Sequence, residues 1–226
     1  MEITALPVSL LRFPIQEIKK IIFYHQTYNE YYRLKKEYAG LKNRMIGVEE
    51  IAQENNRLVR LLEFKRNLVF SSVAAVVIGR DPTDWNDSLV INKGKNQGLA
   101  VGMPVISSGG IVGKIAEVGQ TTSRVILLTD PNFSVAALIQ RTRESGLLTG
   151  TLRGLCRMHY LMEDSQIKIG DKVITSKLSS SFPEGLLIGE VVSIEQYQEG
   201  SAVECLVRPA VNLSQIEEVV VVKNHE

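Results

Sequence analysis

The first 70 residues contain almost no glycine, and a long stretch of them contains no proline. Of the 17 glycines in this 226-residue chain, only Gly40 and Gly47 precede residue 71, and none of the seven prolines lies between Ile15 and Asp81. Such a stretch favours uninterrupted helix, whereas the many glycines that follow favour turns. The chain therefore divides near residue 70 into a helical part and a glycine-rich part.

Other scarcities exclude whole classes of protein. The two cysteines, Cys156 and Cys205, are too few for a disulfide framework or a four-thiolate zinc site, and no Cys/His cluster has metal-ligand spacing. They form either one disulfide in an oxidising compartment or two buried free thiols. The 26 basic and 25 acidic residues give a net charge of +1, which argues against a dedicated nucleic-acid binder. The sequence contains no run of 18 apolar residues, so it predicts no transmembrane helix. Residues 1–11 lack a signal-peptide pattern.

Residues 15–66 predict a single helix of about 50 residues, or about 75 Å, with a coiled-coil seam. Apolar residues recur at alternating spacings of three and four, and one asparagine stands in the seam, where it often fixes the register of two paired helices. We expect these residues to form a dimer interface: Leu34, Leu41, Val48, Ile51, Asn55, Leu58 and Leu62. The alternative is that the stripe packs on the chain's own β region, although a helix this long would overhang a small domain.

After residue 72 the pattern changes to short Val/Ile-rich runs separated by glycine, Asn-Lys-Gly and Asp-Pro turns. About twelve such runs with almost no helix predict small barrels or a sandwich. The expected strands are 73–79, 88–92, 104–107, 110–118, 123–128, 135–139, 147–152, 158–162, 172–176, 186–196, 203–208 and 218–223.

Two stretches of this region resemble each other. Residues 102–106 recur as 170–174, an offset of 68, and residues 109–118 recur as 185–194, an offset of 76, so residues 175–183 are the candidate for an eight-residue insertion. The repeat indicates two related β-barrels, and the fold class is mainly β with a long N-terminal helix. Glycines in such strands usually serve bends or bulges, and those shared by the two copies are Gly102, Gly109, Gly113, Gly170, Gly185 and Gly189.

Patterns that carry chemistry are weak. Ser107, His159 and Asp130 are the residue types of a hydrolase triad, but no nucleophile-bearing motif surrounds a serine. Residues 109–114 look like a phosphate-binding loop, yet they lack its glycine spacing and its Ser/Thr. The arginines near residue 150 suggest either a surface for an acidic partner or an ordinary solvated hairpin; they are Arg141, Arg143, Arg153 and Arg157. No residue is assigned to catalysis, to a cofactor or to a metal.

Several motifs together resemble one family. They are Ile91-Asn-Lys-Gly94, Gly98-Leu-Ala-Val-Gly102-Met-Pro-Val105, Gly110-Ile-Val-Gly113, Leu127-Leu-Thr-Asp-Pro131, Ile169-Gly-Asp-Lys-Val-Ile-Thr175, Phe182-Pro-Glu-Gly185 and Ser214-Gln-Ile-Glu-Glu-Val219, with Glu54-Asn55-Asn-Arg-Leu58 in the helix. In this order, from about residue 45 onward, they resemble the rod-shape-determining MreC proteins.

The resemblance implies a non-catalytic scaffold of the bacterial cell-elongation machinery, on the periplasmic or extracytoplasmic face of the inner membrane. It implies self-association as a dimer or a filament, a class B penicillin-binding transpeptidase and MreD as partners, no nucleic acid, and a membrane helix preceding this sequence. Any open barrel edge would allow strands of a neighbour to be added. The alternative function is a periplasmic adaptor of a transport system, which normally needs a helical hairpin.

The resemblance also implies that the last strand completes the first barrel. The expected domains are therefore a helical coiled-coil stalk at 1–68, a first barrel at 69–140 plus 205–226, and a second barrel at 141–204.

Overall fold

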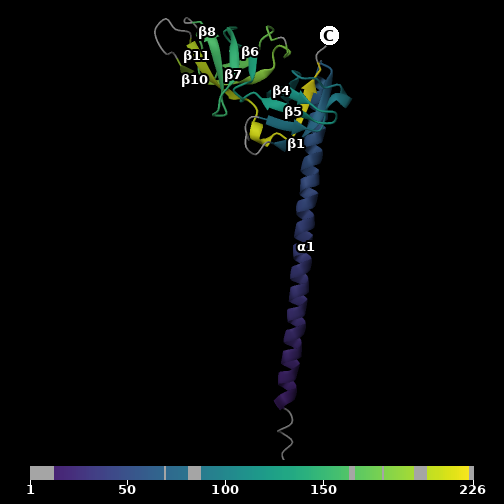
Figure 1. Ribbon diagram of the computed structural model, residues 1–226. Helices are drawn as coiled ribbons and strands as arrows, with labels where there is room; N and C mark the ends of the chain where they lie inside the picture. The colour runs from purple at the N-terminus through teal and green to yellow at the C-terminus, as the bar shows by residue number, and fades with distance from the viewer. Residues whose placement is uncertain are drawn as a thin grey trace, which may run out of the picture. The chain divides into compact units, whose positions relative to one another are not determined.

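The computed structural model describes residues 13–68, 70–80, 88–162, 166–179, 181–195 and 203–223. In these residues one long α-helix precedes twelve strands (Figure 1). The chain divides between Asn56 and Arg57 into two compact units. The elements are α1 (Phe13–Asn67), β1 (Ser72–Arg80), β2 (Ser88–Ile91), η2 (Lys95–Gln97), β3 (Pro104–Ser107), β4 (Gly110–Val118), β5 (Ser123–Leu127), β6 (Ser134–Ile139), β7 (Ser145–Gly150), β8 (Cys156–Leu161), β9 (Lys172–Thr175), β10 (Leu187–Glu195), β11 (Val203–Pro209), η3 (Leu213–Gln215) and β12 (Glu218–Val222).

Helix α1 is unbroken over 55 residues, and its one proline, Pro14, is its second residue, so no proline interrupts its interior. Lys65 and Arg66 lie in its last turn, where positive charge is favourable beside the exposed carbonyl groups. Within the described part of the chain, no helix combines the length and the apolar character that a membrane span requires.

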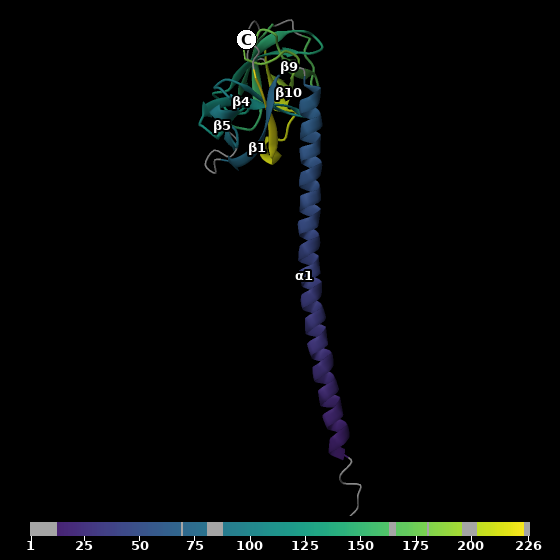
Figure 2. The same ribbon diagram turned by 90° about the vertical axis from the view of Figure 1, so that its right-hand side faces the viewer.

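The strands form two closed six-stranded antiparallel barrels, both visible in Figures 1 and 2. The first has the order β1-β12-β3-β4-β5-β2 and the second the order β10-β11-β8-β7-β6-β9. Each of the twelve strands lies within two residues of its predicted limits, so the predicted fold class is confirmed. Because closed barrels have no free strand edges, the described strands offer no template for the strand addition that an open edge would allow.

The two barrels share one pattern of strand pairing, permuted in sequence. β3, β4 and β5 of the first barrel correspond to β9, β10 and β11 of the second. The first strand of the second barrel, β6, pairs with β7 and β9; its counterpart β12 pairs with β1 and β3, but it comes last in the chain. β12 thus closes the first barrel, and the second barrel lies within the sequence of the first.

The pairing assigns two strands differently from the expected domain limits. β6 lies before residue 140 and most of β11 lies after residue 204, so both were expected in the first barrel; their hydrogen bonds place both in the second. The connections between barrels are instead residues 128–133 and 210–217. Alternating hydrophobicity marks a strand, but it does not say which ladder the strand joins.

The barrels are packed against each other through a continuous apolar cluster. Outward-facing side chains of the first barrel, Ile106 and Ile111, belong to the same buried cluster as the core of the second. The longer β9–β10 connection contributes Phe182, whose ring meets that of Phe133 edge-on at 5.9 Å. This connection holds the extra residues that the two offsets predict, and it fills space between the barrels.

Candidate functional site

The seam residues of α1 are exposed. Large seam side chains such as Leu34, Val48 and Ile51 are 60–68% accessible, and Leu58 and Leu62 are 38% and 53% accessible. The other two positions of the seam, Leu41 and Asn55, are exposed as well. A row of apolar side chains on one helix face is typical of a surface that pairs with another helix.

The last turns of α1 use a different face to hold the barrels. Leu61, Phe64 and Leu68 are partly buried against the shared apolar cluster. Arg57 on the same face forms ion pairs with Glu217 at 2.7 Å and Glu218 at 3.2 Å. Since neighbouring helix residues point about 100° apart, Leu58 and Leu62 face away from this contact.

The shared glycines fall at matched turns. Gly102 and Gly170 have φ values of 87° and 91°. Their N–H groups donate to the carbonyl oxygens of Ile115 in β4 and Val191 in β10, each at 2.8 Å. Left-handed backbone of this kind favours glycine. Gly113 and Gly189 lie in β4 and β10, where the backbone of the adjacent strand comes close.

The third glycine pair differs in backbone and surroundings. Gly185 has φ 82°, whereas a side chain at Gly109 would approach Val211 to 3.3 Å. Next to it, Gly110 faces the carbonyl oxygen of Leu187, so the β3–β4 and β9–β10 hairpins meet between the two barrels.

The residues of the hypothetical triad are not brought together. Ser107 Oγ accepts a hydrogen bond from Gly109 N, and the Asp130 carboxylate accepts one from Asn132 N. His159 pairs instead with Thr149 Oγ1 at 3.0 Å through Nε2 and with Glu204 at 2.7 Å through Nδ1.

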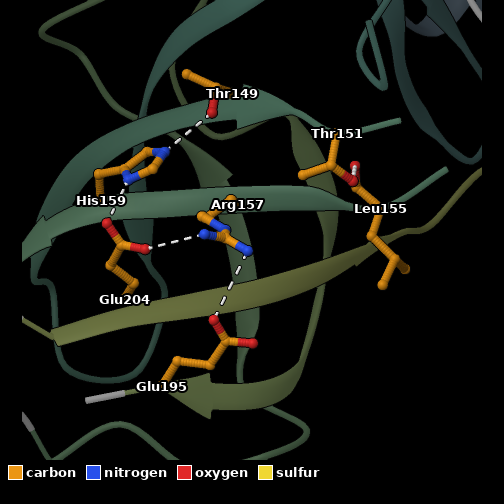
Figure 3. Close-up of polar contacts among 7 residues, drawn as sticks. All are labelled: Thr149, Thr151, Leu155, Arg157, His159, Glu195 and Glu204. Carbon is orange, nitrogen blue, oxygen red and sulfur yellow. Dashed lines mark hydrogen bonds and ion pairs between the residues drawn. The ribbon is translucent and has the colours of Figure 1, made fainter. Parts of the chain in front are cut away.

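The partners of His159 form a polar network on the outside of the second barrel (Figure 3). Glu204 also meets Arg157 at 3.4 Å, and Arg157 meets Glu195 at 3.7 Å. The hydroxyl of Thr149, the imidazole of His159 and the carboxylate of Glu204 are hydrogen-bonded in a row, as in a catalytic triad. However, Thr149 lies within β7, which is paired with a strand on each side. The backbone amides around Thr149 are used in hydrogen bonds to the neighbouring strands. Hydrolysis needs free donors that point at a developing oxyanion. The network therefore ties β7, β8, β10 and β11 together. Sequence reasoning missed it because Thr149 and Glu204 are ten and 45 residues from His159, and only the pairing of the strands brings the three side chains together.

Both cysteines are free and buried in the core of the second barrel. Burial raises the pKa of both thiols, that of Cys205 to about 12, and the Cys156 thiol donates to the Leu128 carbonyl at 3.2 Å. Of the two open alternatives, the structure has the free thiols. Residues 109–114, the other weak motif, form the β3–β4 turn and the start of β4.

The arginines form no common patch. Arg141 pairs with Asp171 and Arg157 with two glutamates, while Arg143 and Arg153 are exposed. The helical hairpin of a transport adaptor is not present in the described residues, which contain one α-helix.

Comparison with known proteins gives one consistent result. A family model described as rod shape-determining protein MreC, barrel core, matches residues 77–223. The cell shape-determining protein MreC of Bacillus subtilis is 34% identical over 209 residues, which cover 87% of this chain and 72% of that protein.

Solved structures agree. The major periplasmic domain of a cell shape-determining filament MreC is 26% identical, with a TM-score of 0.61 over 69% of this chain and 96% of that chain. A Helicobacter pylori MreC, solved in complex with penicillin-binding protein PBP2, is 19% identical with a TM-score of 0.57, over 69% of this chain and 99% of that one, and shares the fold.

Proposed function

Because this chain belongs to the MreC family of rod shape-determining proteins, we propose that it is a non-catalytic scaffold of the cell-elongation machinery. In this proposal α1 pairs with a second copy of the chain, and the barrels bind a class B penicillin-binding transpeptidase. The protein acts by holding partners together at one place, and none of its side chains takes part in a reaction.

The observation that carries the proposal is that α1 has two separate apolar faces. One face, with Leu61 and Phe64, is covered by the chain's own barrels, while Leu58 and Leu62 beside it remain accessible. Self-association through the seam therefore does not compete with packing of the barrels. The ion pairs of Arg57 fix the face that packs inward.

The relatives support the partners and the location. The H. pylori MreC was solved with PBP2, and another relative is described as a periplasmic domain and a filament. We infer by this likeness a class B transpeptidase as the partner, MreD as a second partner, and a place on the periplasmic or extracytoplasmic face of the inner membrane. Two closed barrels packed against each other form a firm support for the turns between their strands, which suits a binding head.

Direct binding tests this function. The whole chain, immobilised on a sensor surface, should bind the periplasmic part of the transpeptidase from the same organism in a saturable manner. A periplasmic protein of similar size and charge serves as the control and should give no saturable signal. Equal responses for the two proteins would contradict the proposed function.

A further inference from the structure

A groove of about 650 Å³ opens at one end of the second barrel. It is lined by residues 141–145, which form the β6–β7 turn and the first residue of β7, by Tyr160 and Met162 near the end of β8, and by Gln166. It lies at the end of the β7–β8 hairpin opposite to the turn at residues 151–155. Neither the helix seam nor the contact between the barrels includes these residues.

Backbone strain is concentrated in this groove. Among the described residues, Arg143 and Tyr160 are the two non-glycine residues with positive φ, and both have φ 63°. Residues other than glycine rarely adopt this backbone conformation, and those that do cluster at ligand clamps and other functional sites. The two strained residues come from different elements, the β6–β7 turn and β8, and both line this groove.

The strain at Tyr160 has a visible effect on its direction. Met158 and Leu161 of β8 pair with Cys205 and Val203 of β11, so β8 has one extra residue in this interval. Because of this bulge both His159 and Tyr160 turn outward between the buried Met158 and Leu161. Tyr160 is 72% exposed and Met162 75% exposed. Bulges often re-aim a side chain in this way beside functional sites.

The groove also contains unused polar groups. The Thr142 hydroxyl is buried without a hydrogen-bond partner in the described structure, where most buried polar groups are paired. The exposed Arg143 guanidinium forms no ion pair with the described residues, whereas the Glu144 carboxylate accepts a hydrogen bond from Met162 N. The groove therefore offers a guanidinium without an ion pair and a hydroxyl donor without an acceptor, beside two exposed apolar side chains.

The walls of the groove are held in place. Arg141 donates to both carboxylate oxygens of Asp171, at 2.8 and 2.7 Å, and to the carbonyl of Gln166. Tyrosine, methionine and arginine are enriched at protein interfaces, and a rigid site loses less entropy when it binds.

We propose that this groove is a docking site for a loop of the transpeptidase that carries an apolar side chain beside a carboxylate. The apolar side chain packs between Tyr160 and Met162, and the carboxylate pairs with Arg143 and accepts from the Thr142 hydroxyl. This docking site rests on the proposed function above, since it names where that partner is bound.

The strained backbone allows variants that remove recognition without harming the fold. Arg143→Gly and Tyr160→Asn each delete the contacting side chain and place a residue that tolerates positive φ, so both proteins should be at least as stable as the unaltered chain. The matched controls lie in the turn at the other end of the same hairpin. They are Arg153→Gly, an exposed arginine, and Leu152→Asn, which is 83% exposed.

The test measures binding of the whole chain to the periplasmic part of the transpeptidase, with thermal unfolding recorded for each variant. Arg143→Gly and Tyr160→Asn should each raise the Kd at least tenfold, and the two controls should stay within twofold. If the unaltered chain binds and both groove variants bind equally well, the docking site is overturned and the proposed function stands.

Two other results would overturn the docking site. If the unaltered chain binds no transpeptidase, the proposed function fails and the docking site fails with it. If the groove variants change only the self-association of this chain in sedimentation, the occupant is a second copy and not the transpeptidase.

Discussion

Gly113 and Gly189 occupy equivalent positions in the two barrels. A Cβ atom added to either would lie 1.9 Å from a backbone carbonyl oxygen of the adjacent strand, that of Ile126 for Gly113 and that of Arg208 for Gly189. Two residues beyond Ile126 and Arg208, the N–H groups of Leu128 and Ala210 donate to the carbonyls of Val112 and Ile188 at 3.0 and 2.9 Å. Both barrels thus bring two strands to the same close approach at the same point.

We expect Gly113→Ala and Gly189→Ala each to lower the free energy of unfolding by about 3 kcal/mol, because the added methyl group must displace the backbone of the neighbouring strand. Chemical denaturation measures the change. Gly102→Ala is the matched control: its φ of 87° strains an alanine, but nothing lies within 4 Å, so the loss should be smaller, about 1 kcal/mol. Equal losses for all three variants would argue against the close approach.

Replacing Val48, Ile51 and Leu58 together by aspartate should convert dimers into monomers with folded barrels. Charges in the seam oppose helix pairing, whereas these exposed side chains contribute little to the barrels. Sedimentation velocity gives the mass, and circular dichroism reports the strands. Lys42, Gln53 and Asn56 replaced together by aspartate are a control off the seam and should leave dimers. A triple seam variant that remains dimeric would contradict the seam.

Acid should weaken the second barrel through Asp171. Hydrogen bonds from Arg141 are the main cause that lowers the pKa of the Asp171 carboxyl, burial acts against them, and Lys168 N adds to them. A carboxyl group whose pKa is lowered by folding stabilises the folded state at pH values above its ordinary pKa of about 3.9. This stabilisation is lost as the pH falls through the lower pKa of the folded state.

Asp171→Asn should therefore be less stable than the unaltered chain at pH 5, and the difference should shrink toward pH 2. Urea denaturation across this range measures it. Glu190→Gln, which removes an exposed pair with Arg208, should change little at any pH. A difference for Asp171→Asn that stays constant with pH would contradict the ion pair.

The two cysteines should resist thiol reagents while the barrel is folded. Their raised pKa values and their burial leave almost no thiolate at pH 8. A chromogenic disulfide reagent should detect two thiols after unfolding in denaturant and almost none before. Ser134→Cys, at an exposed position, should add one thiol that reacts at once. Finding no thiols after unfolding would indicate a disulfide instead.

Local sequence patterns predicted the elements of this fold well. The lack of proline between Ile15 and Asp81 predicted α1, and alternating apolar residues with glycine turns predicted all twelve strands. The repeat predicted the similarity of the barrels, because glycines such as Gly102 and Gly170 are required by the same local backbone. These features depend on neighbours in sequence.

Features that depend on distant residues were not predicted. The assignment of β6 and β11 to the second barrel follows from hydrogen bonds across the barrel. The network of His159 joins four strands, and the outward turn of Tyr160 follows from one extra residue opposite β11. An arginine and a tyrosine give no sign of positive φ in the sequence, so the groove was visible only in the structure.

The central claim is that one chain makes two associations at once, pairing through α1 and binding a transpeptidase through its barrels. Sedimentation equilibrium of the whole chain mixed with the periplasmic part of the transpeptidase tests it most directly. We expect a complex with two copies of each protein, which the triple seam variant reduces to one of each. Two proteins that sediment independently, or a complex whose mass the seam variant leaves unchanged, would contradict it.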